Sequence, residues 1–254
     1  MEDILMSPLL LAALFFVVAF AYSSVGLGGG SSYTALMAIF GVSYVAIPTV
    51  SLTLNLLVTS IGSVNFIRQG HLRLHLIGPF LVTSLPMAYL GGSLDVSKQV
   101  FEWVLLISLC LVAARIYLWD KPGTPHRIGR RWQLLFAALI GAVLGLLAGI
   151  VGIGGGVYLV PLIIVLGLGS PKEAAACGAV FVWVNSLTGL IARLGHHSIN
   201  VAEFVPLILA VATGALLGSH LGAVHLAPRT MERILGIILL VAIALLARKI
   251  ILTW

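Results

Sequence analysis

Long apolar stretches without charge alternate with short basic loops along this chain. No Asp, Glu, Lys or Arg occurs between Asp3 and Arg68, and none occurs from Trp132 to Pro171. A helix needs about 20 apolar residues to cross a bilayer, whereas the strands of a membrane barrel show short alternating segments. Because the apolar stretches are long and do not alternate, the pattern predicts an all-α integral membrane protein.

The breaks within the apolar stretches predict two successive sets of helices with the same order. Each set has a long helix, a glycine cluster, a short helix and three further long helices. In the first half we predict spans at Pro8–Val25, Val50–Ile67, Leu76–Leu94 and Phe101–Trp119, with the short helix at Ser31–Phe40. In the second half we predict spans at Trp132–Val151, Ala174–Ala192, Phe204–Leu221 and Ile234–Leu246, with the short helix at Val157–Gly167.

The glycine cluster itself occurs twice. The segment Val25–Gly30 returns 126 residues later as Val151–Gly156, with glycine at the same four positions. This duplication indicates two homologous halves. We predict a first transmembrane repeat over residues 1–120, a basic cytoplasmic linker over 121–131 and a second transmembrane repeat over 132–254.

The basic loops predict the orientation of the helices. Loops at 68–75 and 120–131 are both rich in Arg and His, so the positive-inside rule places both on the cytoplasmic side. Four crossings in each half then give eight spans, parallel repeats and re-entrant glycine segments. If the short helices also cross, the chain has ten spans in two inverted repeats of five, which is a common plan of transporters. Both arrangements stay open.

Composition supports the membrane prediction and limits the classes of function. Hydrophobic residues make up 60% of the chain, charged residues only 9%, and mean hydropathy is +1.15. Soluble domains carry about 25% charged residues. The net charge of +6 lies in loops between apolar segments, so it indicates membrane orientation and not nucleic-acid binding. Cys110 and Cys177 both lie in apolar segments and are predicted to be buried thiols.

Glycine clusters inside a membrane have two interpretations. Small residues let helices pack closely, or three successive glycines break a helix and free backbone groups that must then line a cavity. A helix that restarts after such a break points its positive end and free N–H groups into the membrane, which suits an anion. We therefore predict a substrate site at the interface of the repeats. Its residues are Gly28, Gly29, Gly30, Ser31, Ser32 and Asn55 in the first half and Gly154, Gly155, Gly156, Val157, Tyr158, Asn185 and Ser186 in the second.

Ionisable groups within the predicted spans are few. His220 is a candidate for proton coupling, and a neutral, hydrogen-bonded histidine is the alternative. Arg115 and Arg193 are expected to extend toward the membrane surface, although Arg68 and Arg193 could hold an anion at a mouth. The sequence has no metal-ligand spacing and no complete dinucleotide fingerprint, so we predict no metal, no cofactor and no enzyme activity.

These features together resemble the sulfite exporter family TauE/SafE, also called the 4-toluene sulfonate uptake permease family. Its resemblance rests on the two glycine clusters, on Arg68-Gln69-Gly70-His71 and on Leu90-Gly91-Gly92. The second half has the more family-like Ser170-Pro171-Lys172-Glu173-Ala174 where the first has Tyr44–Pro48.

The resemblance implies a secondary transporter, expected to be an exporter, of small sulfur-containing anions such as sulfite or organosulfonates. It implies a multi-pass protein of the bacterial plasma membrane. Its partners would be the small anionic substrate, the lipid bilayer and a second copy in a homodimer, without nucleic acid. A non-transporting membrane scaffold or assembly subunit, and a transporter of another small anion, are the alternative functions.

Overall fold

The chain folds into helices that repeat one order twice. The structure is a computed structural model that describes residues 8–24, 27–68, 70–118, 130–166, 168–196, 204–225 and 228–253. Within these ranges there are ten helices and no strand. They are α2 (Pro8–Ser24), α3 (Gly30–Ile39), α4 (Ala46–Arg68), α5 (Leu74–Ser93), α6 (Lys98–Leu118), α7 (Arg130–Val151), α8 (Gly156–Val165), α9 (Pro171–His196), α10 (Val205–His225) and α11 (Pro228–Thr253).

The predicted helices are all present, with ends shifted by a few residues. The short helices α3 and α8 each have 10 residues and follow the glycine clusters, as the sequence predicts. The last helix differs most, because α11 begins at Pro228 and not at Ile234. Most of the predicted linker, 121–131, lies outside the described residues.

Several of these helices are suited to a membrane by length and composition. In the described ranges, four stretches are both long and apolar enough to cross, and further apolar helices are shorter. The four are Ala46–Val64, Leu74–Ser93, Arg131–Val151 and Lys172–Gly195. An all-helical membrane protein is confirmed, while helix length and composition alone do not choose between eight spans and ten.

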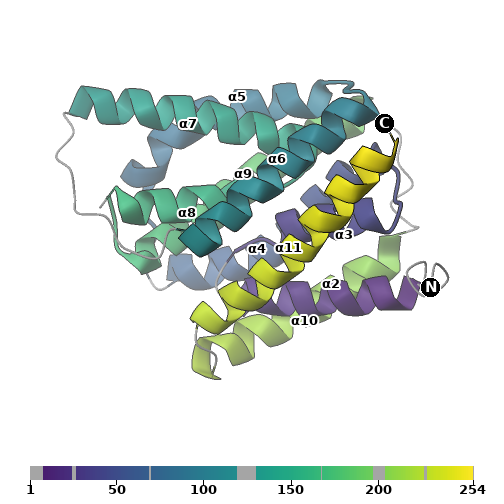
Figure 1. The fold of residues 1–254 in the computed structure, drawn as a ribbon. Coiled ribbons are helices and arrows are strands. Elements are labelled where there is room, and N and C mark those ends of the chain that lie inside the picture. Colours follow the sequence, from purple (N-terminus) through teal and green to yellow (C-terminus); the bar gives the residue numbers. More distant parts are fainter. Residues whose placement is uncertain are drawn as a thin grey trace.

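Helices of the two predicted halves pack closely through small residues. Figure 1 shows α5 beside α7 at one edge of the molecule and α2 beside α10 at the opposite edge. At the first interface Gly141 lies against the backbone of Phe80, and Gly149 lies against that of Ala88. The later residue of α7, Gly149, contacts the later residue of α5, Ala88, so α5 and α7 run in the same direction. Backbones can approach this closely only where a side chain is missing.

Gly145 tests this interface, because a β-carbon placed on it would collide with the backbone of Ser84. We expect Gly145→Ala to destabilise the protein by about 1–3 kcal/mol, the usual cost of over-packing. Gly195→Ala is the matched control, since a β-carbon there meets nothing within 4 Å. Thermal unfolding in detergent measures both variants. Equal midpoints would show that the α5–α7 contact contributes little to stability.

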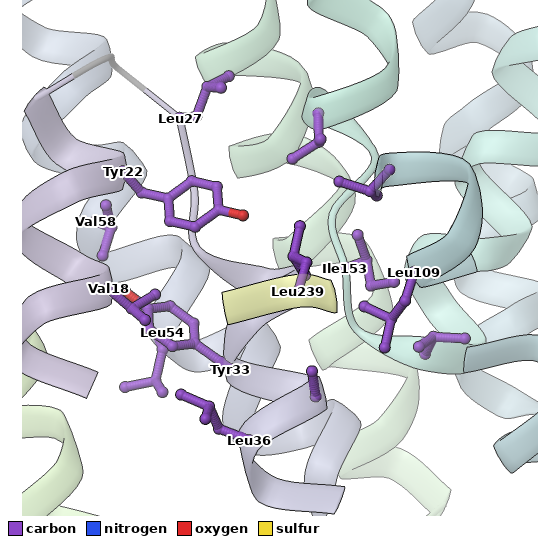
Figure 2. Packing of buried hydrophobic residues seen from close by; sticks show 14 of the residues in the cluster. Val18, Tyr22, Leu27, Tyr33, Leu36, Leu54, Val58, Leu109, Ile153 and Leu239 are labelled. Atoms are coloured by element: carbon purple, nitrogen blue, oxygen red, sulfur yellow. The ribbon is translucent and has the colours of Figure 1, made fainter. Parts of the chain in front are cut away.

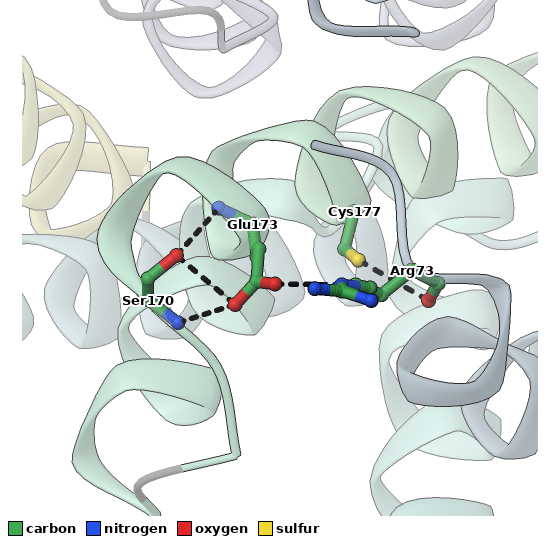
Figure 3. A network of polar contacts seen from close by, with 4 residues as sticks. All are labelled: Arg73, Ser170, Glu173 and Cys177. Atoms are coloured by element: carbon green, nitrogen blue, oxygen red, sulfur yellow. Dashed lines mark hydrogen bonds and ion pairs between the residues drawn. The ribbon is translucent and has the colours of Figure 1, made fainter. Parts of the chain in front are cut away.

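The loop before α5 is tied to the start of α9. Arg73 Nε donates to Glu173 Oε1 at 2.7 Å, and the Cys177 thiol donates to the Arg73 carbonyl at 3.6 Å (Figure 3). Ser170 completes the network, because its N–H donates to Glu173 Oε2 at 2.9 Å and its hydroxyl accepts from the Glu173 N–H at 3.4 Å. This reciprocal pair is a capping box, which explains why α9 begins at Pro171, before the predicted Ala174.

The two central helices, α4 and α9, lie side by side in opposite directions. Trp183 Nε1 donates to Ser60 Oγ at 2.9 Å, whereas Gly189, later in α9, lies against Leu52, earlier in α4. These helices are equivalent in the predicted repeats, and parallel repeats would make them run the same way. The arrangement therefore differs from the parallel eight-span prediction and fits the inverted alternative.

Buried apolar side chains from both halves meet around the short helix α3. Tyr33 of α3 is fully buried and packs on Phe15 of α2, with ring centroids 5.0 Å apart. Figure 2 shows Leu239 and Ile153, both distant in sequence, in the same cluster. The prediction of buried thiols is confirmed for Cys177 and is wrong for Cys110, which lies on the outer face of α6.

Candidate functional site

The break after α7 has a backbone that only glycine adopts readily. Gly152, Gly154 and Gly155 have φ angles of +84°, +79° and +78°. Any other L-residue would be strained at these angles. These three glycines of the second cluster are therefore required by conformation. The sequence indicated a helix break here, and the structure shows a left-handed turn.

The break after α2 uses its glycines differently. Gly29 has a φ of −88°, which any residue can adopt. Space is the constraint instead, because a β-carbon on Gly28 would lie 2.8 Å from Asn55 Oδ1. A β-carbon on Gly29 would lie 2.5 Å from the Tyr33 ring. The two clusters match in sequence and differ in backbone conformation.

The two breaks face each other at Gly30. A β-carbon on Gly30 would lie 2.7 Å from the Ile153 carbonyl oxygen and 2.9 Å from that of Gly152. Val182 of α9 also lies between the breaks, because β-carbons on Gly28 and Gly154 would come within 3.0 and 2.8 Å of its side chain. The start of α3 and the end of α7 thus meet at one point beside the middle of α4 and α9.

Two side chains of α4 hold the broken end of α7. Ser51 Oγ donates to the Gly152 carbonyl at 2.8 Å, and Asn55 Nδ2 donates to the same oxygen at 3.0 Å. Ser51 also lies 3.4 Å from the Gly30 carbonyl. Both side chains are fully buried. A carbonyl freed by a helix break needs such donors inside a membrane.

Buried polar atoms without a hydrogen-bond partner surround this point. Among the described residues they include Asn55 Oδ1 and Ser186 Oγ, both in fully buried side chains that lie beside Gly28 and Gly154. Asn185 Oδ1, on the neighbouring residue of α9, is also buried and unpaired. The Asn185 amide nitrogen donates to the Phe181 carbonyl of its own helix at 2.8 Å. Buried polar groups are normally paired, so unpaired ones indicate a bound molecule or water.

The starts of α3 and α8 supply backbone donors. The first backbone bond of α3 runs from Tyr33 N to Gly29 O at 2.9 Å, and that of α8 runs from Tyr158 N to Gly155 O at 3.2 Å. The amide N–H groups that precede these positions have no acceptor within their helix. The start of a helix also carries partial positive charge, so each start favours an anion.

Comparison of the sequence with known proteins identifies the family of this chain. Residues 11–246 match the sequence profile described as Sulfite exporter TauE/SafE. The chain belongs to the TauE/SafE family. It is therefore a multi-pass membrane protein of a transporter family and not an enzyme.

Relatives of this TauE/SafE protein extend over nearly its whole length. It is 35% identical over 236 residues to the probable membrane transporter protein y4hK of Sinorhizobium fredii, covering 91% of this chain and 95% of that protein. It is 25% identical over 242 residues to the probable membrane transporter protein YjnA of Bacillus subtilis, covering 85% and 91%. No solved structure matches the chain.

Some predicted site residues of this TauE/SafE protein have hydroxyls that are held by other partners. The Ser31 and Ser32 hydroxyls lie 2.8 and 3.3 Å from the Tyr22 hydroxyl, which bridges α2 to α3. The Tyr158 hydroxyl donates to the Ser108 carbonyl of α6 at 2.6 Å, so it does not face the breaks. The His220 side chain lies outside the described part of the chain, and its predicted proton coupling stays a prediction.

Arg193 is the residue whose position the sequence misjudged. Its side chain was expected to extend to the membrane surface, but only 2% of the residue is exposed. Its Nε donates to the Gly149 carbonyl at 3.1 Å and its Nη2 to the Ile150 carbonyl at 2.8 Å. The guanidinium thus caps the end of α7, immediately before the break. Acceptors at a helix C-terminus explain why it turns inward.

Two cavities lie along the α4–α9 seam, one on each side of the meeting point. One of about 440 Å³ includes Val45 before α4 and Arg193 near the end of α9. The other, of about 410 Å³, includes Ser63 late in α4 and Val180 earlier in α9. Because the two helices are antiparallel, the unpaired side chains of Asn55 and Ser186 lie between the cavities along the seam.

Proposed function

We propose that this TauE/SafE protein is a secondary transporter of small sulfur-containing anions, such as sulfite or organosulfonates, with export as its direction. The substrate binds where the two helix breaks meet, between Gly28–Gly30 and Gly154–Gly156. The observation that carries the proposal is the pair of unpaired, fully buried polar atoms of Asn55 and Ser186 at this point, with the unpaired Asn185 oxygen on the neighbouring residue.

The chemistry of this point suits a small oxyanion that must also leave. Amide N–H groups at the starts of α3 and α8 and the Ser186 hydroxyl are neutral donors. Neutral donors stabilise an anion without the strong hold of a full positive charge. The amide oxygens of Asn55 and Asn185 accept hydrogen bonds, so they suit a ligand hydroxyl, as in hydrogensulfite, or a bound water.

Access from both sides would follow the α4–α9 seam. The cavities near Arg193 and Ser63 approach the meeting point from opposite ends of these helices. The repeats are inverted in this proposal, because α4 and α9 run in opposite directions. Inverted repeats with broken helices at the midplane allow one half to rock against the other, which opens the site to each side in turn.

Ligand binding tests the proposal directly. We expect sulfite or a small sulfonate to raise the thermal unfolding midpoint of the purified protein, since a ligand at 100 times its Kd stabilises by about 2.7 kcal/mol. Sulfite, thiosulfate, sulfate, sulfoacetate and taurine form the panel, with chloride at equal ionic strength as the control. Saturable flux of the stabilising anion into proteoliposomes then establishes transport.

The alternatives predict other results. A membrane scaffold, whose glycines serve only to pack helices, predicts no stabilisation by any member of the panel and no flux. A transporter of another anion predicts stabilisation by that anion alone. Stabilisation without flux would retain the binding site and remove the transport function.

A further inference from the structure

The cavity near the end of α9 contains polar groups that the central site does not use. It is lined by Arg193, Asp95, Tyr44 and Ser97, among others, and its volume is about 440 Å³. It lies at the end of α9 opposite the Arg73–Glu173 ion pair, which joins the first turn of that helix. None of the described residues that line it lies against the two glycine clusters, so the cavity is distinct from the meeting point.

Arg193 gives this cavity a buried positive charge. A guanidinium has five N–H groups, and Arg193 donates two of them to the carbonyls of Gly149 and Ile150. Those partners are neutral, so they do not balance the charge of a residue that is only 2% exposed. The remaining N–H groups belong to a side chain that lines the cavity. A planar guanidinium is the group that best recognises an oxyanion.

Other residues of the cavity complete the chemistry of a weak anion site. The hydroxyls of Tyr44 and Ser97 can donate hydrogen bonds to an oxyanion. Asp95 lines the same cavity, and its carboxylate attracts Arg193 and repels an anion. An anion beside Arg193 also experiences the negative charge of Asp95. This repulsion limits the affinity of the site, and a site on a transport path must release its anion.

We propose that this cavity is a vestibule subsite that binds small sulfonate- or sulfite-like oxyanions through Arg193, with Asp95 limiting their affinity. The inference rests on the proposed transport function and adds a second binding site on the path of the transported anion. The guanidinium also holds the last carbonyls of α7 before Gly152. An anion in the vestibule therefore acts on the group that positions the helix break.

Opposite effects of two neutralising variants test the vestibule. Sulfite and methanesulfonate binding to the purified full chain is measured by calorimetry for wild type, Arg193→Gln and Asp95→Asn. We expect Arg193→Gln to weaken binding about tenfold, because a charge-assisted pair is lost. We expect Asp95→Asn to tighten binding severalfold, because the repulsive carboxylate is gone. Arg73→Gln, which neutralises an arginine at the other end of α9, should leave the affinity unchanged.

A structural role for Arg193 predicts a different pattern. If the residue only caps α7, Arg193→Lys and Arg193→Gln should lower the unfolding midpoint and leave the affinities alike. The vestibule predicts that Arg193→Lys, which keeps the charge, binds the anions more tightly than Arg193→Gln. If Arg193→Gln does not fold, Asp95→Asn decides alone, and unchanged or weaker binding overturns the inference.

Flux separates failure of the vestibule from failure of the proposed function. No binding and no flux in wild type would overturn the transport function itself. Saturable flux in wild type with the same apparent KM in Arg193→Gln would remove only the vestibule. A raised KM with little change in maximal flux supports a subsite that captures the anion before it reaches the helix breaks.

Discussion

Replacing Gly30 with alanine is expected to lower anion flux by roughly five- to 100-fold. A β-carbon at this position would lie 2.5 Å from Asn55 Nδ2 and 2.7 Å from the Ile153 carbonyl oxygen. Neither neighbour can move away freely. Asn55 would lose its hydrogen bond to the Gly152 carbonyl, and the Ile153 oxygen belongs to the backbone. Over-packing of this kind costs about 1–3 kcal/mol, and each 1.4 kcal/mol corresponds to a factor of about ten. Flux of radiolabelled sulfite into proteoliposomes measures the effect.

Gly78 offers the matched control for this substitution. Gly78 also lies in a helix, α5, and a β-carbon there meets nothing within 4 Å. Gly78→Ala should therefore transport like wild type. Unfolding midpoints of both variants show whether the Gly30→Ala protein is folded when flux is lost. Normal flux in a folded Gly30→Ala protein would mean that the two breaks need not meet for transport.

The sequence predicted the order of the helices because that order is local information. Uncharged stretches, proline and glycine determine where a membrane helix begins and ends, and the repeat of Val25–Gly30 at Val151–Gly156 marks the two breaks. The capping box of Ser170 and Glu173, which sets the start of α9, also depends on neighbouring residues alone. What the sequence left open was the relative direction of the halves. The basic loops favoured parallel repeats, whereas packed contacts show α4 and α9 antiparallel.

The site was only partly predictable, because its geometry depends on contacts between distant residues. Asn55 and Ser186 were expected from their polarity within apolar helices, and both lie beside the breaks. Nothing local distinguishes Tyr158, whose hydroxyl reaches α6 instead. Ser51 looked like an ordinary serine of a helix, since its role depends on a carbonyl 101 residues away. Arg193 near a helix end resembled a surface residue until the end of α7 provided acceptors for it.

Asn55→Asp is expected to abolish high-affinity anion binding with little change in side-chain size. The carboxylate would stand where the fully buried amide now lies beside both breaks. A like charge about 5 Å from a bound anion costs roughly 3 kcal/mol at an effective dielectric constant of about 20, which weakens binding on the order of 100-fold. The variant also loses the donor to the Gly152 carbonyl, so flux should fall further than affinity. Calorimetry and proteoliposome flux measure the two quantities separately.

Gln133→Glu provides the matched control, because it also turns an amide into a carboxylate but on an exposed residue in the first turn of α7. Its net charge change equals that of Asn55→Asp, so a general electrostatic effect on an anionic substrate would appear in both variants. We expect only Asn55→Asp to lose binding. Equal, small losses in the two variants would place the anion away from Asn55, and the meeting point of the breaks would then serve packing alone. Two results together would support an anion site: loss of binding confined to Asn55→Asp, and loss of flux in Gly30→Ala. They would show that transport depends on a neutral donor and on a glycine without a side chain at the same point. Helix packing alone does not depend on a neutral donor there.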